Sequence, residues 1–444
     1  MVSQAPPIRP SSTLATGGDL RFIGALAVGL ILFIGSVTMF VLSGELEGVL
    51  FNSPETWCFL AVFFFIFGLR CHLWWRYRPI ELRQDVNLPS LTVVIPAFNE
   101  GANVRTSIAS VLRSNYPTDK LQLIVVDDGS TDDTWTHIQQ ASKAHGDGVL
   151  ALRLPRNKGK RHALYEGFSA ATGDVVATLD SDSTLRPDSL RNLVAPMEAD
   201  PTIAAVAGKV LVQNRHQNIL TRMLGVRYIL GFDFVRAYQS ELRTVWCCPG
   251  ALQAYRRNVI ATELDAWLNQ QFLGARCTNG DDHALTNTVL RLGYDSVYQS
   301  NAIVETIVPK TYRQLTRMFT RWGRSATREG LRALRFASGR AAKIRGWKGA
   351  FMLVDAILQP VGILGRLLAL GGGLWIAINH PLALATAAAL TGLFALVYAA
   401  VFLRSERSRD WIFCVCYAYF ALIALAWVQP YATMTVRGNK WLTR

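Results

Sequence analysis

Long apolar stretches lie towards both ends of the chain, and a longer stretch of mixed polarity separates them. Each apolar stretch approaches the roughly 20 residues that a helix needs to cross the hydrocarbon of a membrane. The only charged side chains within them are those of Arg70, Asp355 and Arg366. The pattern therefore predicts membrane-spanning helices on both sides of a water-soluble middle. The stretches cover residues 22–43, 56–75, 349–378, 382–403 and 411–430.

The middle of the chain, residues 88–310, alternates short β-branched runs with amphipathic runs. This alternation predicts an α/β domain with a mostly parallel, doubly wound, Rossmann-like sheet. In such sheets, ligands bind beyond the carboxyl ends of the strands. The predicted strands cover residues 91–96, 121–126, 149–154 and 175–179, and the predicted helices cover 103–112, 134–143 and 160–171.

Composition and charge narrow the class of protein. A net charge of +14 with a mean hydropathy of +0.20 excludes disordered, collagen-like and disulfide-scaffold chains. Basic side chains cluster at 70–83 and 313–348, beside the apolar stretches. The positive-inside rule therefore places the middle in the cytoplasm of a multi-pass protein of the inner (plasma) membrane. The same clustering makes membrane lipids the expected partners of the basic residues and argues against nucleic acid.

Cysteine usage agrees with a cytoplasmic middle. Cys247, Cys248 and Cys277 lie in that part of the chain, and the sequence contains no C-x-x-C pair or zinc-ligand spacing. Disulfides are rare in the cytoplasm. We therefore expect these cysteines to be free thiols.

Acidic side chains follow two of the predicted strands. Asp127 and Asp128 come after one strand, and Asp180 and Asp182 come after another. Two carboxylates at that spacing can face one Mn²⁺ or Mg²⁺ ion, which prefers oxygen ligands and commonly also holds substrate phosphates. A lone D-x-D is more often a solvated turn with Asx hydrogen bonds. The buried strand before Asp180 and the second acidic strand end favour the metal interpretation, and Asp127 and Asp128 are candidates for holding a nucleoside.

Two further segments carry candidate chemistry at predicted helix starts. Residues 157–161 place Lys160 and other basic side chains beside a glycine, which suits a diphosphate or, equally, a solvated basic loop. Residues 280–283 place Asp281 and Asp282 at the start of another helix. Paired acids there are usually caps, and a general base would need a carboxylate near the metal site.

A basic stripe occupies residues 312–335. Its arginines recur every three or four residues, as on one face of a helix, and apolar side chains lie between them. Such a helix is expected to lie on an anionic membrane surface. Trp322 is either an interfacial anchor or an aromatic platform for a sugar ring. The stripe consists of Arg313, Arg317, Arg321, Arg324, Arg328, Arg332 and Arg335.

These motifs, in this order, resemble the family 2 glycosyltransferases with a GT-A fold. The resemblance is closest to membrane-embedded hyaluronan synthases and the rhizobial chitin-oligosaccharide synthase, and it covers about residues 90–444. Any one motif is weak, whereas the ordered set is specific. The motifs are V-I-P-A-F-N-E (94–100), V-D-D-G-S (126–130), G-K-R (159–161), D-S-D-S (180–183), C-C-P-G-A-L-x-A-Y-R-R (247–257), G-D-D-H-A-L-T (280–286), R-W (321–322) and W-L-T-R (441–444).

The resemblance implies a UDP-sugar donor site and an inverting transfer. Asp282 would be the general base that deprotonates the acceptor hydroxyl. The donor residues would be Asp127 and Asp128 on uridine and ribose, Lys160 near the diphosphate, and Asp180 and Asp182 around Mn²⁺ or Mg²⁺.

The resemblance also implies an acceptor site for a growing polysaccharide. Cys247 and Gly250 would lie under the acceptor sugar, and Arg321 and Trp322 would hold its end. Trp441 and Arg444 would belong to a gate near the active site.

Two motifs depart from the family pattern. Met318 stands where the Q-x-x-R-W motif has a glutamine that helps to position the acceptor, which leaves acceptor identity and processivity open. Asp281 stands where glutamate is more common, and His283 stands where arginine is common in the hyaluronan type.

The resulting hypothesis is a processive, inverting, UDP-sugar-dependent polysaccharide synthase that exports a β-linked, N-acetylhexosamine-containing polymer. The alternative is a non-processive membrane enzyme that adds one sugar to a lipid acceptor. Three crossings after residue 349 would leave the tail outside, so one C-terminal stretch is re-entrant or 349–378 holds two elements. The predicted parts are an N-terminal tail with two spans (1–85), a cytoplasmic GT-A domain (86–310), basic interface helices (311–348), a C-terminal membrane region (349–430) and a gate-like tail (431–444).

Overall fold

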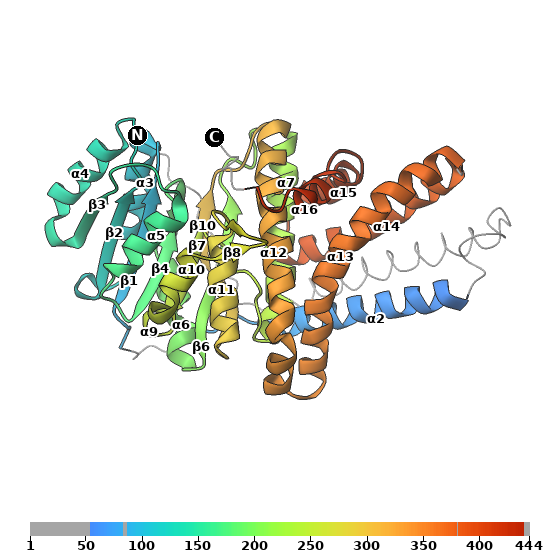
Figure 1. Ribbon diagram of the computed structural model, residues 1–444, viewed down its shortest axis with the longest axis horizontal. Coiled ribbons are helices and arrows are strands. Elements are labelled where there is room, and N and C mark those ends of the chain that lie inside the picture. The colour runs from blue at the N-terminus through green and yellow to red at the C-terminus, as the bar shows by residue number, and fades with distance from the viewer. Residues whose placement is uncertain (1–53, 83–86, 380, 439–444) are drawn as a thin grey trace.

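The computed structural model describes residues 54–82, 87–379 and 381–438 (Figure 1). The predicted span at 22–43 and the predicted gate residues Trp441 and Arg444 lie outside the described residues. A sheet domain forms one end of the molecule, and a set of long helices forms the other. The helix α12 (Tyr312–Ile344) stands between the two parts (Figure 1).

The sheet domain is built on eight strands in the order β3-β2-β1-β4-β7-β6-β10-β5. The strands β1 to β4 run parallel, and β6 runs parallel to β10. In contrast, β7 is antiparallel to β4 and β6, and β5 is antiparallel to β10. The predicted α/β fold with a mostly parallel sheet is therefore confirmed. The strands are β1 (Leu91–Ala97), β2 (Leu121–Asp127), β3 (Val149–Arg153), β4 (Val175–Leu179), β5 (Ser183–Leu185), β6 (Ile203–Val212), β7 (Leu252–Arg256) and β10 (Asp295–Thr306).

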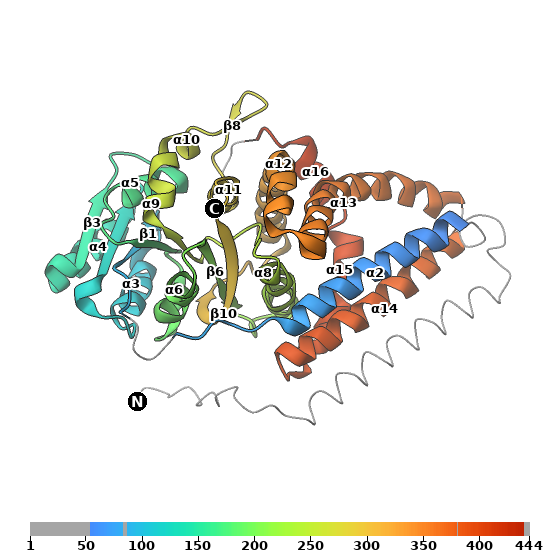
Figure 2. The same cartoon turned by 90° about the horizontal axis from the view of Figure 1, so that it is seen from below.

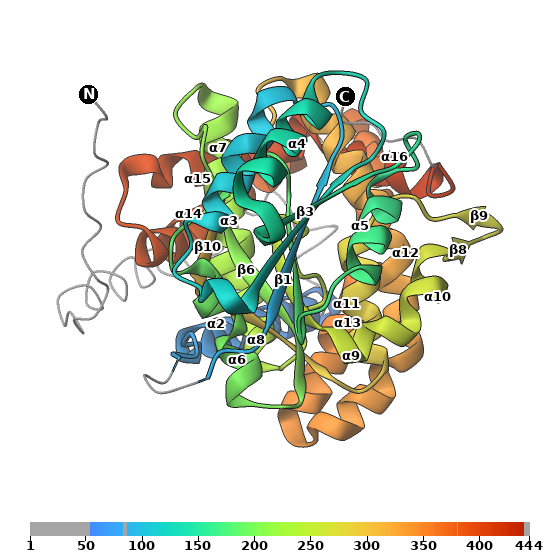
Figure 3. The ribbon, with the colours of Figure 1, turned by 90° about the vertical axis from the view of Figure 1, so that its left-hand side faces the viewer.

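Helices cover both faces of the sheet, which explains why β1 and β4 are apolar runs without alternation. Every residue of these two strands is buried, as expected for strands between two helical layers. Figures 2 and 3 show α3 and α6 on one face and α5 and α11 on the other. The helices of this domain are α3 (Val104–Leu112), α4 (Thr134–His145), α5 (Lys160–Ser169), α6 (Ser189–Ala199), α9 (Arg257–Ile260), α10 (Leu264–Leu268) and α11 (Asp281–Arg291), and β8 (Gln271–Phe272) pairs with β9 (Ala275–Arg276) in a separate hairpin.

One edge of the sheet gathers the ends of several functional segments. The parallel pairing places Ala97 of β1 beside Asp127 of β2. Because β7 is antiparallel to β4, with Leu252 opposite Leu179, the segment that enters β7 lies at the edge where β4 ends. This arrangement brings residues 247–250 beside the acidic strand ends, although they are far apart in sequence.

The helical part projects from the side of the sheet domain (Figures 1 and 2). A buried carboxylate, Asp355 of α13, fastens it by accepting hydrogen bonds from Arg70, Tyr238 and Trp246 at 2.8, 3.0 and 3.2 Å. The helices are α2 (Pro54–Arg76), α7 (Ile219–Ile229), a π-helical turn at Leu230–Arg236, α8 (Ala237–Glu241), α12, α13 (Gly346–Asn379), α14 (Pro381–Ser405), α15 (Ile412–Ala424) and α16 (Val428–Met434).

Within the described ranges, no single helix combines the length and the hydropathy that a membrane crossing needs. One bent pair, Arg409–Ala424 with Val428–Met434, meets that requirement together, and its axes differ by 48°. Such a bend is typical of a broken span or a re-entrant loop, which is one of the alternatives that the sequence left open. The other alternative, two elements within 349–378, is wrong because α13 continues through Pro360.

The basic stripe of α12 does not face a membrane along its whole length. Two of its members, Arg324 and Arg328, are only 6% and 2% exposed. Their guanidinium groups donate to Thr435 and Asn279 respectively. The expectation of one lipid-facing stripe is therefore wrong for this part of the helix. An arginine spacing of three or four residues identifies a helical face, but it does not reveal what covers that face.

Candidate active site

The two acids at the end of β2 shape the loops around them. Asp127 is fully buried, and its carboxylate accepts a hydrogen bond from the backbone N–H of Ser130 at 3.1 Å and lies 3.2 Å from the Arg153 guanidinium. Asp128 accepts hydrogen bonds from the backbone N–H groups of Lys158 and Gly159, both at 2.8 Å. Burial raises the pKa of Asp128 even though these hydrogen bonds oppose the rise. Asp128 therefore fixes the loop that leads into α5.

A pocket of about 500 Å³ lies beside these acids. Its wall comes from Gly129, Ser130 and Thr131 after β2 and from residues 153–155 after β3. A Cβ at Gly129 would stand 2.5 Å from the backbone carbon of Arg156, so only glycine lets the two loops approach this closely. The pocket has the size of a small-molecule site and lies where doubly wound sheets bind nucleotides.

The D-x-D pair follows β4. Asp180 forms an ion pair with Lys160 at the start of α5. The backbone carbonyl of Ser181 accepts a hydrogen bond from Ser107 at 2.7 Å, which holds the segment in place. Burial opposes the charged form of Lys160, but the charges of Asp180, Asp281 and Asp282 outweigh it and raise the Lys160 pKa. The ammonium is therefore a fixed positive charge at the edge of the sheet.

The D-x-D carboxylates fit a divalent cation in their chemistry. No group of three or more His, Cys, Asp or Glu side chains suited to a metal occurs among the described residues. Mg²⁺ is often held by only one or two carboxylates, with substrate phosphates and water completing the shell. Asp180 and Asp182 can supply the protein ligands of such a shared site, with a nucleoside diphosphate supplying the rest.

Asp282 lies at the N-terminus of α11, across from Lys160. Its carboxylate accepts hydrogen bonds from the backbone N–H of His283 at 2.8 Å and that of Gly250 at 3.2 Å. Burial raises the pKa of Asp282, the nearby charge of Asp281 raises it further, and Lys160 opposes both effects. A carboxylate with a raised pKa is a better proton acceptor, as a general base requires.

Gly250 lies close to both Lys160 and Asp282. A Cβ at this position would lie 3.1 Å from the Lys160 ammonium and 3.7 Å from a carboxylate oxygen of Asp282. Both charged groups therefore face the space that a side chain of residue 250 would fill. Burial raises the pKa of the neighbouring Cys247 thiol well above its usual value, so this group stays protonated and is no nucleophile.

The close packing of Gly280 on α12 gives a testable prediction. Gly280 has a φ of +74°, and a Cβ there would lie 2.0 Å from the Ser325 hydroxyl. Gly280→Ala should therefore lower the thermal unfolding temperature and the activity together, through steric overlap added to a backbone cost of about 1–2 kcal/mol. Gly293→Ala is the matched control, because its φ is +88° and no atom lies within 4 Å of the added carbon. Equal unfolding temperatures for the two variants would contradict the proposed packing.

Arg321 and Trp322 are neighbours on α12, and Arg321 lies within electrostatic range of the acids. Burial lowers the pKa of Arg321, while the charges of Asp281, Asp180 and Asp282 favour its charged form. Trp322 is 38% exposed and stacks on Phe319, with ring centroids 5.5 Å apart. The partly open indole is consistent with an aromatic platform for a sugar ring.

Met318 belongs to an apolar cluster of the helical part, against which Phe319 and Tyr228 also pack. It is 6% exposed and packs in an apolar cluster with Leu224, Leu315, Leu425 and Val428. Met318→Gln should destabilise the fold by about 1–3 kcal/mol, because the cluster offers a buried amide no obvious partner. It should leave the affinity for acceptor unchanged, and Met318→Leu should change neither quantity much. Thermal unfolding and acceptor titration check this, and a gain in acceptor affinity would contradict it.

The described end of the chain returns to the site. Arg324 donates to the Thr435 hydroxyl at 3.0 Å, and Arg328 donates both to the Val436 carbonyl at 3.3 Å and to the Asn279 carbonyl at 2.8 Å. Residues 435–436 are therefore tied through α12 to the loop that carries the acid motif. This places the approach to the predicted gate on the active-site side of the molecule.

The motifs did not predict the surroundings of two residues, Arg161 and Tyr228. Arg161, part of the predicted basic loop, is buried and donates to the carbonyls of Trp267 and Asn279, so it braces the α11 loop and does not face the site. Tyr228 of α7 lies near the D-x-D acids and Trp322, and the sequence analysis overlooked it. No motif contains it, and the only signal was an aromatic polar residue in an aliphatic helix.

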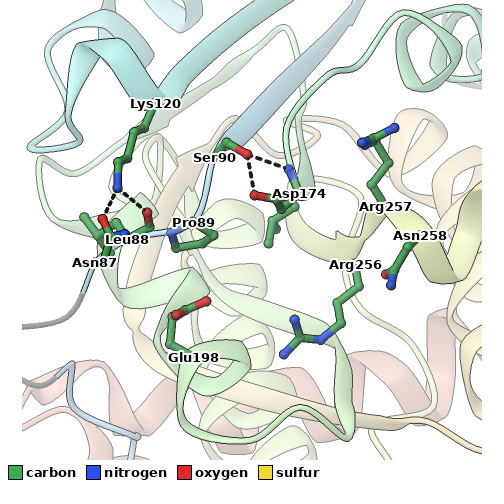
Figure 4. Close-up of a pocket in the computed structure, with 11 residues that line it drawn as sticks. Asn87, Leu88, Pro89, Ser90, Lys120, Asp174, Glu198, Arg256, Arg257 and Asn258 are labelled. Atoms are coloured by element: carbon green, nitrogen blue, oxygen red, sulfur yellow. Dashed lines mark hydrogen bonds between the residues drawn. The ribbon is translucent and has the colours of Figure 1, made fainter.

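A second pocket, of about 590 Å³, opens at the opposite edge of the sheet (Figure 4). Ser90 precedes β1 and donates to Asp174, which precedes β4, at 2.6 Å. Lys120 donates to Asn87 and to the Leu88 carbonyl. The Lys120 ammonium therefore already has two hydrogen-bond acceptors. The pocket lies at the amino ends of the parallel strands, away from the acids described above.

The chain is similar in sequence to one protein family and to several known proteins. Residues 92–263 match the model of glycosyl transferase family 2. An N-acetylglucosaminyltransferase of Rhizobium meliloti is 31% identical over 372 residues, which are 83% of each chain. A hyaluronan synthase of Streptococcus pyogenes is 37% identical over 246 residues, which are 54% of this chain and 58% of that protein. A solved mannosyltransferase of Pyrobaculum calidifontis, in complex with GDP-mannose and Mn²⁺, is 22% identical, with a TM-score of 0.48 over 79% of this chain and 98% of its own.

Proposed function

The chain belongs to glycosyltransferase family 2, and we propose that it is a processive, inverting polysaccharide synthase that uses UDP-sugars. Its product would be a β-linked, N-acetylhexosamine-containing polymer. The observation that carries the proposal is the convergence on Gly250, where a positively charged group, Lys160, and a carboxylate with a raised pKa, Asp282, both face the position that a Cβ of residue 250 would take. One group suits a leaving diphosphate and the other suits an attacking hydroxyl.

The donor nucleotide would bind along the carboxyl edge of β2 and β4. The pocket beside Asp127 and Asp128 would take uridine and ribose. Asp180 and Asp182 would hold Mn²⁺ or Mg²⁺, which, when bound, neutralises charge on the diphosphate. Lys160 would move from its ion pair with Asp180 onto the diphosphate oxygens.

Transfer would then be one displacement. Asp282 accepts the proton of the acceptor hydroxyl, whose oxygen forms a bond to the anomeric carbon as the bond from that carbon to the UDP oxygen breaks. The electron pair leaves with UDP, and the configuration at the anomeric carbon inverts from α to β. The positive charges of Lys160 and Arg321 stabilise the departing diphosphate.

The acceptor would be the growing chain end. Cys247 and Gly250 would form the floor under its last sugar, and Arg321 and Trp322 would hold that sugar beside Asp282. Trp441 and Arg444 would close the site from the C-terminal tail. Each of these roles is a proposal that follows from the family and from the positions of Gly250 and Arg321 relative to Asp282.

We also propose a place in the cell. The projecting helices and the bent pair α15–α16 would anchor the enzyme in the inner membrane with its sheet domain in the cytoplasm. The polymer would leave through the helical part, because the acceptor platform on α12 lies between the sheet domain and those helices (Figure 2).

A donor panel tests the proposed function. Membranes that contain the protein would receive radiolabelled UDP-sugars singly and in pairs, with Mn²⁺ or Mg²⁺. Polymer from UDP-GlcNAc alone would mean a chitin-type enzyme, and polymer only with UDP-GlcNAc and UDP-GlcA together would mean a hyaluronan type. No incorporation from any UDP-sugar would contradict the proposal, and one labelled lipid that never lengthens would leave only single transfer.

A further inference from the structure

Tyr228 packs against Trp322 and lies within electrostatic range of the D-x-D acids. It belongs to α7, two residues before the π-helical segment Leu230–Arg236. Its ring centroid lies 6.2 Å from that of Trp322 and 6.2 Å from that of Phe232. The charged groups that act on its hydroxyl include Asp182, Arg321 and Asp180. The ring therefore contacts Trp322, and its hydroxyl lies within electrostatic range of the D-x-D acids and Arg321.

The hydroxyl of Tyr228, a partly buried residue, lacks the hydrogen bond that several other tyrosines make. Among the described residues it has no hydrogen-bond partner. In contrast, Tyr116, Tyr255 and Tyr298 each donate a hydrogen bond, to the Pro89 carbonyl, Gln253 and Asp233, at distances of 2.6 to 2.8 Å. A tyrosine in the interior of a protein normally finds such a partner. The hydroxyl group of Tyr228 can therefore donate a hydrogen bond to a ligand at the edge of the reaction site.

Burial keeps that donor protonated. Desolvation raises the pKa of Tyr228, and the charges of Asp182 and Asp180 act in the same direction against the two arginines nearby. A protonated phenol can donate one hydrogen bond and accept another. Sugar hydroxyl and amide groups match both capacities, whereas a phosphate offers only acceptors.

The order of the binding groups along the site indicates which part of the substrate the Tyr228 hydroxyl contacts. If the diphosphate lies at Asp180 and Asp182 and the acceptor sugar lies on Trp322, the sugar that is being transferred must lie between them. Tyr228 interacts with groups on both sides of that position. We propose that Tyr228 hydrogen-bonds the transferred sugar of the UDP-sugar donor and so contributes to recognition of the donor sugar. The inference rests on the proposed function for the placement of diphosphate and acceptor.

A plain packing role for the ring makes a different prediction. Tyr228→Phe keeps the ring contacts with Trp322 and Phe232 and removes only the hydroxyl. If the ring alone matters, this variant should behave like the wild type. If the hydroxyl binds the sugar, the variant should lose affinity for the sugar nucleotide and keep its affinity for UDP, which lacks the sugar.

The test is a pair of titrations of the purified full-length protein in Mn²⁺, one with UDP-GlcNAc and one with UDP. Tyr228→Phe should weaken UDP-GlcNAc binding about tenfold, the size of one good hydrogen bond, and change UDP binding less than twofold. Tyr165→Phe is the matched control, because its hydroxyl binds Asp265 on the surface, at 2.7 Å. It should change neither affinity.

Each outcome decides the inference. Unchanged UDP-GlcNAc affinity in Tyr228→Phe would overturn it, as would an equal loss for UDP and UDP-GlcNAc, which would place the hydroxyl on the diphosphate. Binding is measured without turnover, so the result stands even if the donor panel finds no transfer. A wild-type protein that binds neither nucleotide would overturn both the inference and the proposed function.

Discussion

Replacing Asp282 by asparagine is expected to slow sugar transfer by about 10²–10⁴-fold, the usual contribution of a positioned general base. The carboxamide oxygen of asparagine can keep one of the two hydrogen bonds that Asp282 accepts, because Gly250 and His283 donate to different carboxylate oxygens. Losing the other should cost about 1–3 kcal/mol of stability, so the fold and the donor site should survive. It cannot accept a proton. Single-turnover incorporation of radiolabelled sugar measures the loss, and titration with UDP should give the wild-type affinity.

The neighbouring acid provides the control for this variant. The charge of Asp281 raises the pKa of Asp282, so Asp281→Asn should lower that pKa and retain transfer. Because Asp282 must be deprotonated to act, activity rises with pH through its pKa. The rising limb of kcat/KM should therefore move to lower pH in Asp281→Asn. Near-normal turnover in Asp282→Asn, or a limb that does not move in Asp281→Asn, would contradict the base assignment.

Removing one D-x-D carboxylate is expected to abolish the effect of metal on nucleotide binding. In the wild type, UDP should bind more tightly with Mn²⁺ than with EDTA, because Asp180 and Asp182 would hold the metal and the metal would offset the charge of the diphosphate. Asp182→Asn should reduce affinity in Mn²⁺ by at least about 10–100-fold, since losing even an outer-shell partner costs that much. The affinity measured in EDTA should hardly change, and calorimetric titration separates the two conditions.

A surface acid serves as the matched control for the metal prediction. Asp119 is exposed in the turn before β2, and Asp119→Asn carries the same change of charge. It should leave both affinities at the wild-type level. If Asp182→Asn bound UDP with the full Mn²⁺ enhancement, the D-x-D pair would not be the metal site.

The sheet was predictable because its strands are short β-branched runs between helical patterns. The same reasoning located Asp127 and Asp180 correctly at strand ends, since parallel strands share a carboxyl edge. It could not show that β7 runs antiparallel, which is what brings Gly250 beside Asp282 and Lys160. That contact joins residues far apart in sequence, so it depends on strand order, which local patterns do not encode.

Side-chain surroundings were the least predictable part of the site. The spacing of Arg324 and Arg328 defined a face of α12, but whether lipid or protein covers that face depends on where α16 and the α11 loop return. The departure at Met318 suggested a changed acceptor site, whereas the side chain packs among apolar residues. Tyr228 was missed because its importance comes from neighbours on other elements.

The most direct test of a polymer synthase is the size of its product when little donor has been used. Membranes would receive a brief pulse of radiolabelled UDP-GlcNAc, with UDP-GlcA where the donor panel requires it, followed by excess unlabelled donor. We predict long labelled chains at low conversion, with the label moving into still longer chains during the chase. A single labelled product that keeps its size through the chase would contradict the account and leave an enzyme that adds one sugar.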